Sequence, residues 1–346
     1  MEIIAKKIIS IILCAILLFS ISACKGNKQR FDKVYIDYFD TVITIIGYEN
    51  DKHDFETVCE KLEADLDRYH KLFDIYNTYD GVNNLCVINK SAYKSAIKVD
   101  SEIIDFLLFC KQMHTLTKGN TNVALGSVLS IWHNYRTNAL NNPQNAKIPN
   151  SNDLIEASKH CNIDDIIINE TESTVYIADE KLTIDAGAVA KGYVLEILSN
   201  KYTLDGYAIN MGGMVKGFGT REDGSDWSVG IENPNDVSQT EIAVTPKNLT
   251  VVTSGSYQRY YEVNGVRYHH IINPETLYPE NEYLSVTVLS DNAALGDVLS
   301  TALFNMSIEE GKSVLENIDE KTSVMWILKS GEKKYYGDFE SYIKKA

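Results

Sequence analysis

The sequence predicts a protein that contains both helices and strands, with helices mainly in its first half and strands mainly in its second. Apolar residues recur at helical spacing over residues 54–71, and a second helix runs from its N-cap Asp100 to about residue 117, before Gly119. Beyond residue 227, short apolar runs are bounded by Asn, Pro and Ser, which is typical of strands. The dipeptide Asn264-Gly265 lies between two such runs and is a strong signal of a two-residue hairpin.

The remaining elements follow from the same patterns. The first two strands are expected over residues 34–38 and 42–48, interrupted at Phe39-Asp40-Thr41, and a polar loop is expected over 73–84. Further helices are expected over residues 123–135, 151–160, 293–306 and 308–318, with a surface insertion over 134–152. Further strands are expected over residues 175–177, 182–184, 207–209, 215–218, 227–232, 241–244, 249–252, 257–263, 266–272, 283–289, 324–328 and 334–336.

The N-terminus resembles an export signal rather than part of the fold. Lys6 and Lys7 precede an apolar stretch over residues 8–21, which is too short to span a bilayer comfortably. Small residues then lead to Cys24, and this junction predicts a lipoprotein signal peptide over residues 1–23. Cys24 would carry the lipid (palmitate), residues 24–33 would form a tether, and residues 34–346 the domain. A short transmembrane anchor is the alternative, and both place the domain at the cell membrane on its extracytoplasmic face.

The charge and cysteine content exclude several classes of protein. The chain has a formal net charge of −15, which argues against nucleic-acid binding, because that requires a basic surface. An anionic ligand would therefore need local cations or a metal ion. Outside the N-terminal segment, Cys59, Cys86, Cys110 and Cys161 are widely spaced, so they predict buried thiols, or a disulfide outside the cytoplasm, but no zinc site.

The stretch over residues 182–202 predicts a strand, a small-residue turn and a helix. This geometry points backbone N–H groups at an anion, and Gly187 and Ala188 allow a ligand to approach the main chain. Asp185 and Lys191 flank the turn with opposite charges, and a second glycine turn follows at Gly212-Gly213. Together the two turns favour a phosphate-bearing ligand. A tight strand–helix corner followed by a hairpin is the structural alternative.

Two further groups of residues are candidates for chemistry. Asp297 and Thr301 are four residues apart, which places a carboxylate and a hydroxyl on one face of a helix. With a carbonyl from the 185–188 turn they would offer oxygen ligands suited to Mg²⁺, although a polar patch on an amphipathic helix is the simpler interpretation. His269 and His270 are adjacent on a strand and face opposite sides, so one at most faces a given cleft, and a structural role is the common case.

The order of the motifs adds information that no single motif carries. The chain contains, in sequence, IDAGAVAKGYVLEIL, NMGGMVKGFG, WSVGIENP, VVTSGSYQRYYEVNGVRYHHIINPETLYP and LGDVLSTALF. From about residue 34 to 340 it resembles the ApbE family of lipoproteins, the FAD:protein FMN transferases. The resemblance implies an α+β fold related to the T-fold, with mixed or antiparallel sheets packed against helices. It also implies that FAD and Mg²⁺ are bound, and that FMN is attached through a phosphoester to a Thr or Ser of a flavin-carrying membrane or surface redox protein.

The resemblance also assigns site residues. It implies that His270 is catalytic, and that Ala188, Asp297, Ser300 and Thr301 hold or adjoin the metal. The residues implied to contact FAD are Phe39, Tyr76, Asn120, Thr121, Asn122, Asp185, Lys191 and Ile272.

Several positions depart from the family pattern. Phe39-Asp40-Thr41 replaces Met-Gly-Thr, and Thr121-Asn122-Val123-Ala124 lacks the carboxylate of Phe-Asp-Ile-Thr. Lys191 stands where Glu is common, and Leu277 ends a stretch that usually reads Asp-Pro-x-Thr-Gly. These changes concern the FAD contacts more than the reaction class. An FAD pyrophosphatase, a non-catalytic flavin-binding lipoprotein and a surface scaffold are the alternative functions.

Overall fold

An eight-stranded antiparallel sheet forms the centre of the protein. The computed structural model describes residues 28–345, so the expected signal peptide and Cys24 lie outside the described residues. In sheet order the strands are β1 (Gln29–Tyr38), β2 (Thr41–Glu49), β6 (Tyr207–Met211), β7 (Met214–Phe218), β10 (Thr250–Gly255), β13 (Tyr283–Ser290), β14 (Thr322–Leu328) and β15 (Lys333–Tyr336).

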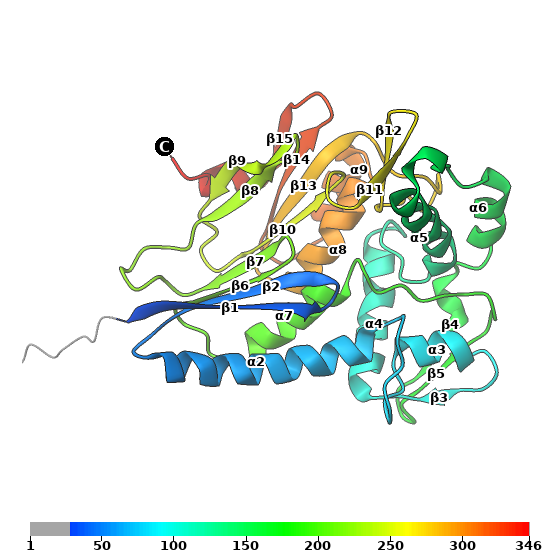
Figure 1. Ribbon diagram of the computed structural model, residues 1–346, viewed down its shortest axis with the longest axis horizontal. Coiled ribbons are helices and arrows are strands. Elements are labelled where there is room, and N and C mark those ends of the chain that lie inside the picture. Colours follow the sequence, from blue (N-terminus) through cyan, green and yellow to red (C-terminus); the bar gives the residue numbers. More distant parts are fainter. Residues whose placement is uncertain (1–27, 346) are drawn as a thin grey trace, which may run out of the picture.

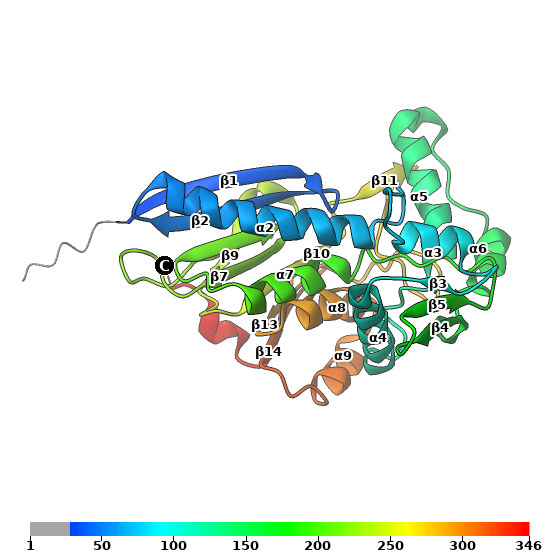
Figure 2. The ribbon, with the colours of Figure 1, turned by 90° about the horizontal axis from the view of Figure 1, so that it is seen from below.

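Three helices cover one face of this sheet: α2 (Lys52–Phe73), α7 (Ala190–Lys201) and α8 (Ala293–Phe304) (Figure 2). Their apolar sides and the facing strands form the main core. The opposite face is partly covered by the hairpin β8 (Val229–Asn233) and β9 (Asp236–Val244), which packs with the C-terminal Phe339 and Tyr342 in a second core.

A smaller, mostly helical part lies beside one end of the sheet (Figure 1). Its helices are α3 (Leu85–Ser91), α4 (Ser101–Leu116), α5 (Gly126–Asn141) and α6 (Ser151–Ser158), and α9 (Ile308–Leu315) follows α8. It also contains the three-stranded sheet of β3 (Ile97–Lys98), β5 (Thr174–Ile177) and β4 (Ile166–Asn169) and the hairpin of β11 (Tyr260–Val263) and β12 (Val266–His269). The α+β fold with antiparallel sheets is therefore confirmed.

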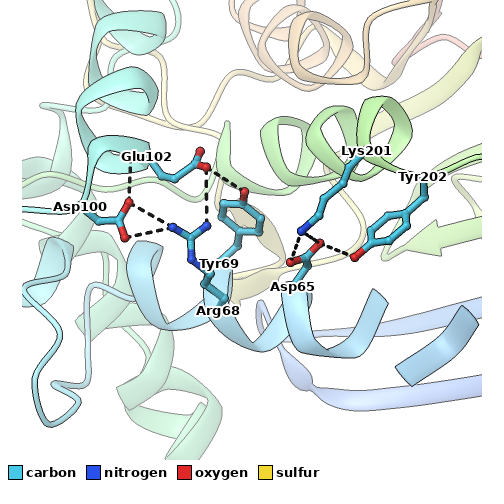
Figure 3. Close-up of polar contacts among 7 residues, drawn as sticks. All are labelled: Asp65, Arg68, Tyr69, Asp100, Glu102, Lys201 and Tyr202. Carbon is cyan, nitrogen blue, oxygen red and sulfur yellow. Dashed lines mark hydrogen bonds and ion pairs between the residues drawn. The ribbon is translucent and has the colours of Figure 1, made fainter. Parts of the chain in front are cut away.

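Polar contacts fix α2 against two other helices (Figure 3). The buried carboxylate of Asp65 accepts hydrogen bonds from Lys201 Nζ and Tyr202 Oη, both at 2.8 Å, at the end of α7. Three residues further along, Arg68 Nη2 lies 3.1 and 3.0 Å from the two oxygens of Asp100. Asp100 also caps α4 as expected, by accepting from the Glu102 N–H.

Some boundaries differ from the sequence-based expectation. Strand β1 begins at Gln29 rather than 34, because Phe31 stacks on Phe55 of α2 with ring centroids 5.6 Å apart. Residues 29–33 therefore belong to the sheet and not to a tether. Helix α5 starts at Gly126 and continues to Asn141, into the expected surface insertion, because Trp132 and Ala139 on one of its faces are buried.

Other expected strands form only a single bridge or are shorter than predicted. The expected strand over residues 182–184 makes only one bridge, between Thr183 and Leu125. The hairpin strands β11 and β12 are shorter than expected, because the chain turns after His269 to bond Asn273 N–H to the Tyr278 carbonyl. Helix α3 and strand β4 were not predicted. Within residues 28–345 no helix is long and apolar enough to cross a membrane, and the four cysteines described are free thiols.

Candidate active site

A cavity of about 510 Å³ opens between the end of the main sheet and the smaller helical part. Its walls come from the β1–β2 turn, the loop after α2, the 120–122 loop, the 185–188 turn, the end of β12 and α8. Twelve of the thirteen residues assigned to flavin, metal or catalysis line this cavity, namely Phe39, Tyr76, Asn120, Thr121, Asn122, Asp185, Ala188, Lys191, His270, Ile272, Asp297 and Thr301. The thirteenth, Ser300, does not.

One buried part of the cavity is a corner where α7 packs closely on α8. Asp297 is only 5% exposed, and its Oδ2 accepts the Gly192 N–H at 2.8 Å, with Lys191 Nζ 3.8 Å away. Burial raises the pKa of Asp297, and the ammonium of Lys191 and the Gly192 N–H oppose this rise. Only glycine fits at position 192, because a Cβ there would lie 2.4 Å from Asp297 Cβ and 2.5 Å from the Ala293 carbonyl. We call Asp297, Thr301, Lys191 and Ala188 the buried corner.

Ser300 adjoins Asp297 but does not line the cavity. It is 0% exposed, and its Oγ bonds to Ser254 Oγ at 2.8 Å and donates to the Asp297 carbonyl at 3.0 Å. These bonds connect α8 to β10 and use the hydroxyl. Thr301, one position along the helix, lines the cavity, as the four-residue spacing from Asp297 predicted for two side chains on one face.

The 185–188 turn is held by a residue that the sequence did not single out. Asn89 of α3 donates to the Ile184 carbonyl at 2.9 Å and accepts the Ile184 N–H at 2.8 Å. Asp185 then accepts the Gly187 N–H at 2.8 Å, and burial raises the pKa of this carboxyl. The turn therefore has a fixed shape before any ligand arrives.

The two adjacent histidines have different environments. His269 is 2% exposed, its Nε2 contacts the Glu280 carbonyl, and its Nδ1 accepts the Ile271 N–H at 3.2 Å, so both ring nitrogens are used. Both histidines line the cavity, contrary to the expectation that one at most would do so, but His270 follows the end of β12 and its buried Nδ1 has no partner in the described part of the chain. Burial, then His269 and the nearby cations, lower the pKa of His270 to about 3. His270 is therefore neutral at physiological pH.

The β1–β2 turn forms one side of the opening. Phe39 and Asp40 both have positive φ, at 55° and 49°, a conformation that non-glycine residues adopt rarely. The turn is held by two residues that the sequence analysis missed, both through the backbone. Phe39 N–H donates to His70 Nδ1 at 3.3 Å, and Arg259 Nη2 donates to the Asp40 carbonyl at 2.8 Å.

The 120–122 loop uses its side chains to fix itself in place. Thr121 Oγ1 donates to the Val298 carbonyl at 3.0 Å, and Asn122 Nδ2 donates to the Cys161 carbonyl at 2.9 Å. Asn122 Oδ1 accepts the Ala124 N–H at 2.9 Å, and Asn120 Nδ2 donates to the Thr117 carbonyl at 3.2 Å. These side-chain bonds thus position this wall of the cavity.

The opposite side of the opening is aromatic and basic. Tyr76 is 56% exposed, and its ring centroid lies 5.9 Å from that of His133 on α5. Arg136, one turn further along α5, places Nη2 3.1 Å from His133 Nδ1. We call Tyr76, His133, Arg136 and Arg259 the cavity mouth. Of these four residues, only Tyr76 was predicted.

Comparison with known proteins identifies the family of this chain. The model of the ApbE family matches residues 39–326, which is most of the chain. The chain belongs to the ApbE family. The match contains the buried corner, His270 and the cavity mouth.

Relatives and solved structures agree with this assignment. A Klebsiella pneumoniae protein named FAD:protein FMN transferase is 28% identical over 279 residues, covering 77% of this chain and 82% of the relative. A Haemophilus influenzae protein of the same name is 25% identical over 329 residues, covering 90% of both. The crystal structure of an ApbE protein from Thermotoga maritima has a TM-score of 0.77 at 25% identity, covering 92% of this chain and 100% of that one. The flavin transferase ApbE from Vibrio cholerae has a TM-score of 0.74 at 21% identity, covering 91% and 99%, and supports the fold.

Proposed function

We propose that this protein transfers FMN from FAD to a Thr or Ser hydroxyl of a flavin-carrying redox protein. The observation that carries the proposal is the meeting, in one cavity, of a buried carboxylate, Asp297, and a histidine, His270, whose buried Nδ1 has no partner within residues 28–345. The names of the ApbE relatives support FAD as the donor and a protein as the acceptor.

The donor atoms of the buried corner fit Mg²⁺. Among residues 28–345 there is no group of three or more His, Cys, Asp or Glu that could hold a metal by itself. Mg²⁺ in phosphoryl-transfer sites is commonly held by one or two carboxylates and by the phosphates of the substrate. Asp297, Thr301 and the Ala188 carbonyl are all oxygen donors and suit this mode. When bound, Mg²⁺ would neutralise charge on the phosphate oxygens.

His270 is the residue suited to move the proton. The acceptor hydroxyl attacks the phosphorus on the FMN side of the pyrophosphate, and its proton passes to the neutral ring of His270. A new P–O bond to the acceptor forms, the bond from phosphorus to the bridging oxygen breaks, and AMP leaves with that oxygen. Most of the catalysis in such a step comes from positioning and charge neutralisation. The fixed 185–188 turn and the 120–122 loop provide the positioning.

The test is to incubate the purified protein with FAD, Mg²⁺ and a candidate acceptor and to look for a flavin-fluorescent acceptor band on a denaturing gel. Omitting Mg²⁺ and replacing the acceptor Thr or Ser with Ala should each abolish the band. Release of free FMN and AMP without any labelled acceptor would instead identify an FAD pyrophosphatase. FAD binding with no product of either kind would identify a non-catalytic flavin-binding protein.

We also propose that the protein is lipid-anchored through Cys24 at the extracytoplasmic face of the cell membrane. Because β1 starts at Gln29, only residues 25–28 separate Cys24 from the sheet, so an anchor at Cys24 would hold the domain close to the membrane. A Cys24→Ser variant should remain unprocessed or unlipidated and should fractionate differently from the wild type. Identical processing and membrane association in this variant would contradict the proposal.

A further inference from the structure

Two arginines from separate parts of the chain line the cavity and form no ion pair with a carboxylate of residues 28–345. Arg136 comes from α5 and Arg259 from the segment before β11, and both line the cavity. The chain has 48 acidic against 33 basic residues, so a carboxylate partner would be easy to provide. Within residues 28–345, however, the arginines paired with carboxylates are Arg30, Arg68 and Arg221, and neither cavity arginine has such a pair.

Most of the hydrogen-bonding capacity of this pair is unused. A guanidinium has five N–H donors. In the described part of the chain, Arg136 contacts only His133 Nδ1, and Arg259 donates only to the Asp40 carbonyl. The two charges also act on each other, since the pKa of Arg136 is lowered by burial and then by Arg259. An anion between or beside the two guanidinium groups would relieve this repulsion.

The location of Arg136 and Arg259 indicates which anion they bind. Both arginines line the same cavity as His270, whose buried Nδ1 has no partner within residues 28–345, and both charges act on its ring. In the proposed reaction His270 accepts a proton from a hydroxyl that attacks phosphorus, so groups around it also surround the reacting phosphate. A planar guanidinium matches the oxygens of a phosphate better than a point charge does.

We propose that Arg136 and Arg259 together bind the phosphate on the FMN side of FAD, the group that is transferred. Their N–H groups would hold the non-bridging oxygens and stabilise the charge that develops on them. This site is separate from the metal ligands of the buried corner. The identity of the ligand rests on the proposed function, whereas the ability to bind a phosphate monoester beside a flavin does not.

The experiment compares FMN with riboflavin, which differ only in the phosphate. Binding is measured by flavin fluorescence or calorimetry in EDTA, so that a metal cannot contribute. The wild type should bind FMN more tightly than riboflavin. Arg136→Gln and Arg259→Gln should each weaken FMN binding by about 10-fold, as expected for a lost charge-assisted hydrogen bond, and should leave riboflavin binding unchanged.

Arg267→Gln is the matched control. Arg267 lies on β12, stacks on Tyr260 at 4.1 Å and does not line the cavity, so this variant removes the same charge elsewhere. It should leave the preference for FMN unchanged. Arg136→Lys and Arg259→Lys keep the charge without the planar donors, so they should retain part of the preference even if a Gln variant folds poorly.

Several results would overturn the proposal. One is equal loss of FMN and riboflavin affinity, which would mean that the arginines shape the flavin pocket. Another is unchanged FMN binding with a raised KM for the acceptor alone, which would mean that they bind carboxylates of the acceptor. A wild type that prefers FMN but transfers nothing would contradict the proposed function and leave the phosphate site standing. A double Gln variant that keeps both transfer and the FMN preference would contradict the phosphate site alone.

Discussion

The buried corner and the cavity mouth lie in the same cavity but are built differently. In the buried corner, Asp297 is 5% exposed and is held by the backbone of α7, where Gly192 permits the two helices to touch. At the mouth, Tyr76 is 56% exposed, and Arg259 is also exposed to solvent. Electrostatic interactions are strong in a dry interior and screened at a wet surface. Single substitutions should therefore cost much more in the buried corner than at the mouth.

The largest effect is expected for Asp297→Ala, which removes the only carboxylate among the expected metal ligands. Transfer should fall by several orders of magnitude and recover in part at high Mg²⁺, because Mg²⁺ is commonly held by only one or two carboxylates. FAD affinity should fall less. Ser300→Ala is the control, since Ser300 lies on the same helix with its hydroxyl outside the cavity. Unchanged Mg²⁺ dependence in Asp297→Ala would remove this residue from the metal site.

The next largest effect is expected for His270→Ala, and it distinguishes His270 from the adjacent His269. His270→Ala should lower transfer by roughly 10²- to 10⁴-fold with little change in FAD binding, the usual contribution of a positioned acid–base group. His269→Ala should instead lower the melting temperature, because it leaves the Glu280 carbonyl and the Ile271 N–H without partners. Initial rates and thermal unfolding of both variants distinguish these outcomes. A greater loss of transfer in a folded His269→Ala protein would reverse the assignment.

The pH dependence gives a second test of His270. A histidine with the usual pKa of 6.5 would produce a rise in rate through that pH. Because the pKa of His270 is lowered to about 3, its neutral, basic form is already present well below pH 6.5. The kcat/KM for FAD should therefore show no limb near pH 6.5 that is lost in His270→Ala. Finding such a limb would mean that the ring is more hydrated than the structure indicates.

A smaller effect, on stability, is expected for Gly192→Ala. The added Cβ would lie 2.5 Å from the Ala293 carbonyl, so α7 must move away from α8 at a cost of about 1–3 kcal/mol. Gly296→Ala in α8 is a milder comparison, because its nearest atom is a side-chain methyl of Val252 at 3.1 Å. Denaturant unfolding of both variants measures the difference. Equal stabilities would show that the contact between the helices is looser than described.

The smallest effect is expected at the mouth, for Tyr76→Ala. An aromatic contact contributes about 0.5–1.5 kcal/mol beyond burial, and this ring is largely exposed, so the KM for FAD should rise less than about 10-fold. Tyr76→Phe should behave like the wild type, because the Tyr76 hydroxyl makes no hydrogen bond in the described part of the chain. Steady-state kinetics at varied FAD would show this. A loss as large as that of Asp297→Ala would remove the contrast between the mouth and the buried corner.

Local sequence patterns predicted the structure correctly wherever the interacting residues are close together in the sequence. The four-residue spacing of Asp297 and Thr301 predicted that both face one way, and the cavity confirms it. The cap at Asp100 and the hairpin at Asn264-Gly265 were also predicted correctly, because each depends on the backbone within a few residues. The order of motifs indicated the ApbE family, which the family match confirms.

The sequence by itself determined the class of fold, the family and twelve residues of the cavity, since helical spacing, turn residues and motif order are written in neighbouring positions. Only the tertiary structure decided which side chains remain available to a ligand. Asn89 holds Ile184 from 95 residues away, and Arg259 holds Asp40 from 219 residues away. His269 and His270 differ in the same way: both line the cavity, but His269 has both ring nitrogens bonded, whereas Nδ1 of His270 has no partner within residues 28–345. The physical reason is that burial and hydrogen bonding depend on what packs nearby in space, and local spacing does not specify those neighbours.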